Sequence, residues 1–153
     1  MADLAEQTII NNLAAQVRSI EGVKNAYDFA KNPDSLNNAQ LPAMAFWPNF
    51  EAEPKGHFNL WRNQFNVVGS LYVAPRQSGG RLKFLENSAM PFGFKFRQKF
   101  QNESVIQSLL GTGTGISQAW LISGNYGAGT PQLTYSGIEY IGWVFTWRFL
   151  EIN

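Results

Sequence analysis

The sequence predicts an α+β fold, with a mainly antiparallel β-sheet flanked by an N-terminal helix and one or two middle helices. Three observations favour it. An amphipathic helical stripe opens the chain, alternating apolar and polar residues mark several long extended segments, and the elements follow the order helix, strands, helices, strands. With 153 residues, the chain is long enough for one domain over 1–153 with a real core.

The first helix is the clearest element. Asp3 is placed to cap it, with Glu6 three residues later at the spacing of a capping box, and Gly22 is placed to end it. Its apolar residues recur at steps of three and four, as one face of a helix requires. They are Ile10, Leu13, Ala14, Val17 and Ile20.

Three extended segments follow the helix. Residues 22–29 and 41–47 read as short strands joined by a polar loop, and we expect Pro48 to halt the second. Residues 58–73 alternate as a long half-buried strand does, and Gly69 suggests a bulge or a bend within it. On one side fall Trp61, Phe65, Val67, Leu71 and Val73, and on the other Arg62, Gln64, Asn66 and Ser70.

The middle of the chain predicts helices over 81–100. Residues 81–90 read as a short helix broken at Pro91. Phe92, Phe96 and Phe100 then lie four apart, which fits a helical stripe. Because Phe94 and Phe96 also alternate with basic residues, a strand remains the alternative for this second piece.

Two strands are expected to close the chain, over 115–126 and 136–152, with a flexible hairpin tip at 127–133. The last strand has an almost wholly aromatic side and an opposite side, including Tyr140, Val144 and Leu150, that is only partly polar. If helices cover one face of the sheet, the other keeps an apolar patch, which monomers seldom leave large. We therefore expect a second copy of the protein to shelter part of this strand. The aromatic side carries Ile141, Trp143, Phe145, Trp147 and Phe149.

The composition excludes several kinds of functional site and several classes of protein. There is no cysteine and one histidine, His57, which excludes disulfides, thiolate nucleophiles, and sulfur or multi-histidine metal sites. No apolar run is long enough for a membrane span, and acids stand where a signal peptide would carry positive charge. We expect no membrane partner and a chain that stays in the cytoplasm where it is made.

The net charge of +1 hides an uneven distribution. Residues 1–53 hold seven acids and three bases, which gives −4, whereas residues 76–100 hold six bases and one acid, which gives +5. Two such regions can steer copies into a head-to-tail contact, or they can lie side by side in one molecule and neutralise each other. With so small a total, we expect no sequence-specific binding to nucleic acid, although DNA can pass through an assembled lumen.

The sequence offers little catalytic chemistry. The glycines at 111, 113 and 115 precede an expected strand and lack the Gly-Lys-Ser/Thr of a phosphate loop, so they favour a mobile turn. Glu51 and Glu53 have no positioned partner, and His57 cannot be assembled into a serine triad, since no nucleophile elbow is present. We expect no enzyme, no catalytic residue, no cofactor and no metal.

Tryptophans on the expected strands leave a second hypothesis open. They could line a stacking platform for a carbohydrate or another flat ligand, in a small binding module. At least half of these rings fall on the side needed for the core, which favours a packing role. The residues concerned are Trp61, Trp120, Trp143 and Trp147.

The layout of the whole chain resembles one family. The passage Gly22-Val23, Tyr27 and Leu41-Pro42-Ala43 after an amphipathic helix, and the Tyr135-Ser136-Gly137 entry to a long last strand, are similar to those of tail-terminator and head–tail completion (neck) proteins of tailed bacteriophages. The resemblance covers about 130 residues, and the chain departs from it in its tryptophan content and basic 76–100 segment.

That resemblance implies a small α+β fold whose copies assemble into a ring, typically a hexamer. Such a ring caps the finished tail tube, blocks further growth and joins the tube to the head. The implied partners are other copies of the chain, the tail tube or sheath protein and the head-side connector protein. The implied location is the neck of a virion assembled in the host cytoplasm, with another tail, neck or baseplate subunit as the alternative.

We therefore expect aromatic and basic side chains to form the contacts between copies, because buried interfaces favour aromatic residues and arginine. The contact between neighbours in a ring is heterologous, so two different surfaces must meet. The interface candidates are Trp61, Arg62, Arg81, Arg97, Tyr140, Trp143, Trp147 and Arg148.

Overall fold

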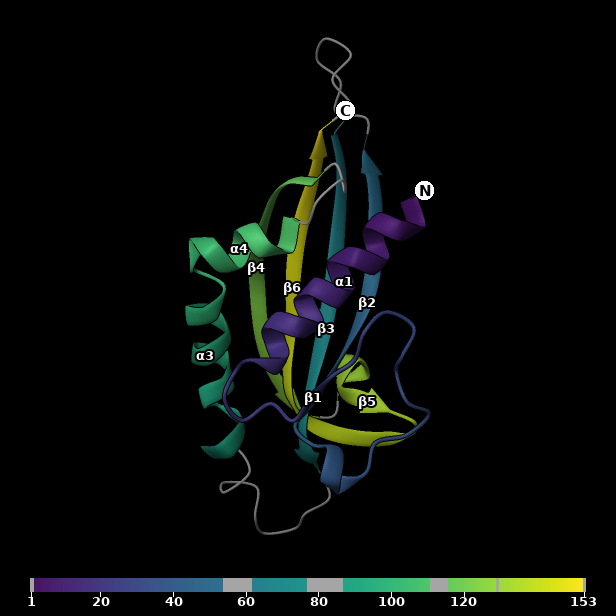
Figure 1. Ribbon diagram of the computed structural model, residues 1–153. Helices are drawn as coiled ribbons and strands as arrows, with labels where there is room; N and C mark the ends of the chain where they lie inside the picture. The colour runs from purple at the N-terminus through teal and green to yellow at the C-terminus, as the bar shows by residue number, and fades with distance from the viewer. Residues whose placement is uncertain (1, 54–61, 77–86, 111–115, 129, 153) are drawn as a thin grey trace.

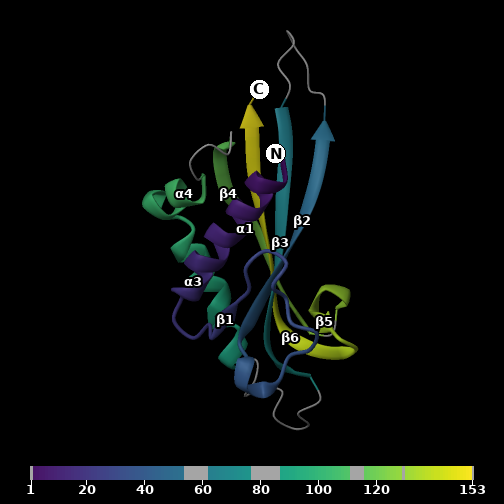
Figure 2. The same cartoon turned by 45° about the vertical axis from the view of Figure 1, so that its right-hand side comes forward.

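The computed structural model shows one twisted sheet with helices on one face (Figure 1). It describes residues 2–53, 62–76, 87–110, 116–128 and 130–152. Seen at a second angle, the helices α1, α3 and α4 all lie on the same side of the sheet, and β5 lies on the other side near one end (Figure 2). The predicted α+β class, with a mainly antiparallel sheet and flanking helices, is confirmed.

Four long strands build the sheet, in the order β2-β3-β6-β4. Each pairs antiparallel with its neighbour, so strand directions alternate across the sheet. The short β1 adds a parallel pair to β2, and β5 pairs with β6 off the main path. The strands are β1 (Asn25–Ala26), β2 (Ala43–Glu53), β3 (Arg62–Pro75), β4 (Ile116–Ala128), β5 (Thr134–Tyr135) and β6 (Ile138–Ile152).

The main core lies between the sheet and the three helices α1 (Ala2–Arg18), α3 (Pro91–Lys99) and α4 (Glu103–Leu110). The expected stripe of α1 is buried there, together with Ile9. The strands contribute alternate residues, as the period of a strand requires. From β3 and β6 these are Phe65, Val67, Leu71, Val73, Ile141, Phe145, Trp147 and Phe149.

A second, smaller cluster covers the opposite face near one end of the sheet. Tyr72 and Tyr140 project from β3 and β6, and Leu133 and the chain around Leu36 and Leu41 close over them. Two 3-10 turns support this cover, η1 (Asn38–Gln40) and η3 (Pro131–Leu133). The far end of the same face carries no helix, as Figure 2 shows.

The ends of α1 differ from the prediction. The helix already begins at Ala2, so Asp3 lies within it and does not cap it. It ends at Arg18, and turns at Ser19 and Ile20 lead to Gly22, whose φ of +97° suits a residue without a side chain. Gly22 therefore marks the exit of the chain and not the last helical residue.

Pro48 does not halt β2, which was predicted to stop there. The strand continues to Glu53, with Pro48 opposite Val67 of β3. Pro42 and Met44 turn their carbonyl groups toward β1, so by alternation the backbone nitrogen of Pro48 faces the same, outer edge. A missing N–H removes no ladder bond at an open edge, which is why the strand tolerates the proline.

Gly69 does not form the bulge that was one of the two predicted alternatives. It pairs regularly with Phe46 and Phe145, and a Cβ there would come within 2.9 Å of both Met44 and Trp147. The glycine therefore leaves room for a large ring above the strand. The register shift between β3 and β6 lies further along, between Tyr72 and Ala74.

The middle segment is helical, which excludes the strand alternative for its second part. Phe92, Phe96 and Phe100 point into the core and Phe94 points outward, as a helix through this segment requires. Residues 87–89 are also helical, while residues 81–86 of the first predicted helix lie outside the described part of the chain. The helix α4 was not predicted.

The segment predicted as a flexible tip at 127–133 is partly ordered into η3. Leu133 is fully buried in the second cluster. After β5, Ser136 and Gly137 both adopt positive φ, 51° and 80°, as the two central residues of a tight hairpin turn between β5 and β6. Through this hairpin the chain passes from η3 and β5, which lie at the second cluster, into β6 of the main sheet.

Candidate assembly surface

The aromatic side of β6 is internal to the molecule. Phe145, Trp147 and Phe149 have exposed fractions of 1%, 0% and 0%. Phe96 of α3 stacks on Phe145 with ring centroids 4.2 Å apart, and Phe100 packs edge-on against Trp147 at 5.2 Å. The expectation that sister copies shelter these rings is therefore wrong, because the helices of the same chain already cover them.

Tyr140 is also buried, at 1% exposure. Its ring meets that of Tyr72 edge-on at 5.2 Å, within the second cluster. Tyr140 and Trp147 were both predicted to contact a neighbouring copy. Both predictions are wrong, because a side chain with almost no accessible surface cannot contact another molecule.

Trp143 is half-buried and holds α3 against the sheet. Its indole Nε1 donates a hydrogen bond to the carbonyl oxygen of Ala89 at 2.8 Å. The ring lies over Gly93, where a Cβ would come within 2.4 Å of it. The structure thus gives Trp143 a packing role, with only part of its surface left for another contact.

Arg148 lies on the face opposite the helices, beside Asn66 of β3 and Trp120 of β4. It is partly buried, and its Nε donates a 3.4 Å hydrogen bond to Asn66 Oδ1. Trp47 and Trp120 are the exposed tryptophans of the described residues, at 39% and 37%. Arg148 is therefore available at a surface that also exposes an aromatic ring.

Four candidates remain, and the structure places them in different parts of the molecule or does not describe them. Arg97 is exposed on α3. Trp61 and Arg81 lie outside the described residues, as do residues 77–80 of the loop at 76–80 and residues 54–57 of the charged connection that the sequence predicts at 49–57. Residues 49–53 of that predicted connection belong to β2 instead. Arg62 opens β3, paired with Ile152 of β6. Of the eight candidates, the structure brings Arg97 and Trp143 together in the lining of a groove between α3 and β4, which none of the other described candidates joins.

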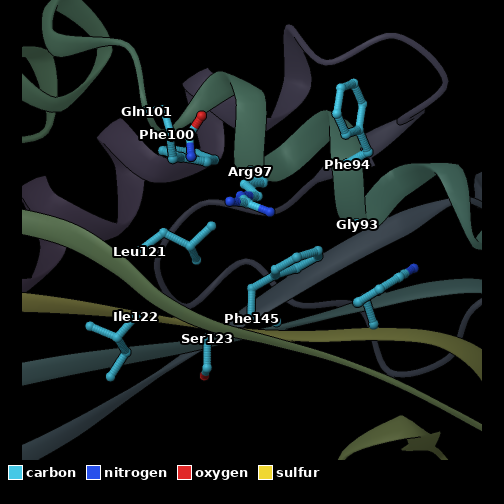
Figure 3. A pocket seen from close by; sticks show the side chains of 11 residues that line it. Gly93, Phe94, Arg97, Phe100, Gln101, Leu121, Ile122, Ser123 and Phe145 are labelled. Carbon is cyan, nitrogen blue, oxygen red and sulfur yellow. The ribbon is translucent and has the colours of Figure 1, made fainter.

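A groove lies between α3 and β4 on the described surface. Its volume is about 510 Å³, and it lies between the helix and the terminal strand of the sheet (Figure 3). Its floor is apolar, with Phe145, Leu121 and Trp143, and Phe100 closes one end. Phe94 stands at the rim, with its ring directed away from the strand.

Arg97 supplies the only charge among the residues that line this groove. In Figure 3 its side chain lies between α3 and the strand, above Phe145. Within the described part of the chain no carboxylate pairs with it. An apolar floor with one free guanidinium at the opening suits a segment that combines an apolar residue with an acid.

The ion pairs of the side chains that the structure describes do not link the acidic region to the basic one. Arg18 pairs with Asp28 at 3.1 Å, both in the acidic N-terminal part, and Arg76 pairs with Glu139 at 3.0 Å. Lys95 donates to the carbonyl oxygen of Glu21 and lies 5.0 Å from the centre of the Phe92 ring. No ion pair among these residues joins the acidic first third to the basic helix α3.

The described residues contain no group of three or more histidine or acidic side chains placed to hold a metal ion. Over the same residues, no helix is long and apolar enough to cross a membrane. Burial raises the pKa of four tyrosines, Tyr27, Tyr72, Tyr135 and Tyr140, and the shift is large for Tyr72. These groups lie in and around the second cluster and stay neutral at physiological pH.

Sequence reasoning missed the exposed apolar residues that border the groove and the open face. Phe94, which lines the groove, is 69% exposed, and Met90, directly before α3, is 49% exposed. Ile122 of β4 is 36% exposed. The helical stripe of Phe92, Phe96 and Phe100 carried a signal for Phe94, because a residue two positions along a helix points away from the stripe.

Comparison with known proteins gives no family for this chain. No protein-family model matches the sequence, and no curated protein is significantly similar to it.

Proposed function

We propose that this protein is a structural, non-enzymatic subunit of a tailed-phage virion, a tail terminator whose copies close into a ring. The ring caps the tail tube and offers its other side to the head-side connector. Two grounds support the proposal: the resemblance in the layout of the sequence, and the uncharged strand β4 at the edge of the sheet. The tube or sheath protein, the connector and the chain itself are its partners.

The observation that carries the proposal is the terminal strand β4. It spans thirteen residues at the edge of the sheet and contains no charged residue. Proteins usually protect such an edge with charges, prolines or a covering element, because its free backbone groups invite another chain. Two register shifts against β6 bend β4, yet Trp120 and Ile122 remain exposed on it.

The mechanism is geometric. Strand directions alternate from β2 to β4, so a neighbouring copy of the same orientation places its β2 antiparallel to β4 of the first copy. A row of copies can therefore continue the alternation, and it closes into a ring if the rotation per copy returns on itself. The finished ring would match the last layer of the tube and block the addition of another.

Electron microscopy of the purified protein, alone and mixed with tail tubes, tests the proposal. Isolated rings, or rings seated on tube ends, are the expected result. Long polymerised tubes would favour the alternative of a tube or baseplate subunit. Dispersed single molecules that also leave tube ends bare would refute the terminator function.

The binding-module alternative has weaker support. Trp47 and Trp120 lie on β2 and β4, separated by β3 and β6. At roughly 4.8 Å per strand this places them about 14 Å apart, too far for one sugar ring to stack on both. Quenching of tryptophan fluorescence by soluble glycans, without assembly, would favour that alternative.

A further inference from the structure

We propose that the α3–β4 groove of one copy receives the first turns of α1, residues 2–6, from the next copy. This inference rests on the proposed ring and names the contact that builds it. The contact is heterologous, since it joins two different surfaces of the same chain.

The groove side combines apolar surface with unpaired positive charge. Phe94 and Ile122 border it at 69% and 36% exposure, and Arg97 lies in its opening without an acidic partner among the described residues. Lys99 follows Arg97 on the same helix. These basic residues of the last turn of α3 also interact favourably with the negative end of the helix dipole.

The opposite flank of the molecule ends in a segment of matching chemistry. The first turns of α1 have the sequence Ala-Asp-Leu-Ala-Glu, with two carboxylates and a leucine within five residues. In both views α1 runs across the sheet, and its N-terminal end lies over the β2–β3 side, away from α3 (Figures 1 and 2). One flank is thus acidic and the other basic.

The two surfaces also lie in the same layer. Both α1 and α3 pack on the helix-bearing face of the sheet, so copies related by rotation about an axis along the strands bring them together without inverting either copy. Among the side chains that the structure describes, no ion pair joins α3 to the acidic N-terminal part, and none of their carboxylates pairs with Arg97.

Disulfide trapping tests the contact, and the chain is suited to it because it has no cysteine of its own. We would place Ala5→Cys in the first turns of α1 and Gln101→Cys in the groove lining of the same chain. Mild oxidation should then give a ladder of covalent multimers. The matched control pairs Ala5→Cys with Gln132→Cys, an exposed residue of η3 beside the second cluster, and should stay mainly monomeric.

Charge exchange adds a second readout. In the Ala5→Cys/Gln101→Cys chain, Arg97→Glu should reduce the ladder by at least about tenfold, since like charges facing each other cost more than a kilocalorie per mole. Adding Asp3→Lys and Glu6→Lys should restore it.

The proposed contact would be refuted if the ladder were no stronger than that of the control pair. It would also be refuted if Arg97→Glu left the ladder unchanged. If the unmodified protein still forms rings in that case, the proposed function stands and the contact lies elsewhere. If it forms neither ladder nor ring, both proposals fail.

Discussion

At the scale of single residues, Gly93 and Trp143 show how tightly α3 is fitted to the sheet. The indole of Trp143 lies where a Cβ of residue 93 would stand, at 2.4 Å. It cannot move aside easily, because its Nε1 is bonded to Ala89 and its ring stacks against Phe145 at 5.6 Å. The glycine is therefore required by packing and not by its backbone angles.

Gly93→Ala should lower the free energy of unfolding by about 1–3 kcal/mol, because the clash outweighs the roughly 1 kcal/mol that alanine gains in a helix. Urea unfolding at one protein concentration measures this change. Phe94→Ala, the next residue of α3 and 69% exposed, is the matched control and should change stability by less than about 0.5 kcal/mol. Equal losses in both variants would contradict this account of the packing.

The tyrosines of the second cluster make stability depend on alkaline pH. Tyr72 packs edge-on against Tyr135 and Tyr140 and donates a hydrogen bond to the carbonyl oxygen of Gln132 at 3.3 Å. Burial raises the pKa of Tyr72 well above its usual 10.0, with neighbouring tyrosines adding to the effect. The folded state therefore favours the neutral phenol.

Because the folded pKa is raised, the stability linked to it is fully present below pH 10 and is lost as pH rises above the unfolded value. We expect the free energy of unfolding to stay level from pH 7 to 9 and to fall above pH 10. Tyr72→Phe should flatten that fall, since one buried phenol no longer titrates. An unchanged slope in the variant would show that Tyr72 is not the group responsible.

At the scale of elements, β6 is the centre of the molecule because it pairs with β3 on one side and β4 on the other. Gly142 of β6 lies where β3 shifts register, and a Cβ there would come within 1.8 Å of the carbonyl oxygen of Leu71. A backbone atom inside a sheet cannot rotate away as a side chain can.

Gly142→Ala should therefore cost at least about 3 kcal/mol or prevent folding altogether. Thermal unfolding followed by circular dichroism measures this effect. Gly137→Ala is a useful comparison, since its Cβ meets nothing within 4 Å and only its φ of +80° resists the change. The prediction would be wrong if Gly142→Ala were the milder of the two.

The sequence predicted most elements because periodicity marks them. The stripe of α1 and the alternation of β3 and β6 needed no knowledge of tertiary contacts. The passage of β2 through Pro48 was missed because it depends on which edge of the strand is open. For α4, the spacing of Val105, Ile106 and Leu109 carried a helical signal that was left unused.

The candidate site was harder to predict than the fold. Strand parity located the aromatic side of β6 correctly, but it could not tell which rings the helices of the same chain would cover. Of the eight candidates, Arg97 is exposed beside an apolar groove, whereas Tyr140 and Trp147 are buried. The exposure of Trp47 could be seen only once its strand was placed, whereas the helical spacing already carried a signal for Phe94.

At the scale of the whole molecule, the proposed assembly rests on uncovered surfaces and not on the aromatic strand. The molecule has an uncharged open strand, β4, and an apolar groove beside it. The ion pairs of the described side chains do not link the acidic region to the basic one. Each of these features is costly to leave exposed in a solitary subunit, and the proposed head-to-tail contact would cover all of them together.

The most direct test is the molar mass in solution, measured by light scattering over a wide range of protein concentration. We predict that the mass rises from 17.2 kDa and levels off at a fixed multiple of that value, as a closed ring requires. Arg97→Glu should shift the rise to higher concentration without changing stability. A mass that stays at 17.2 kDa at every concentration would contradict the account.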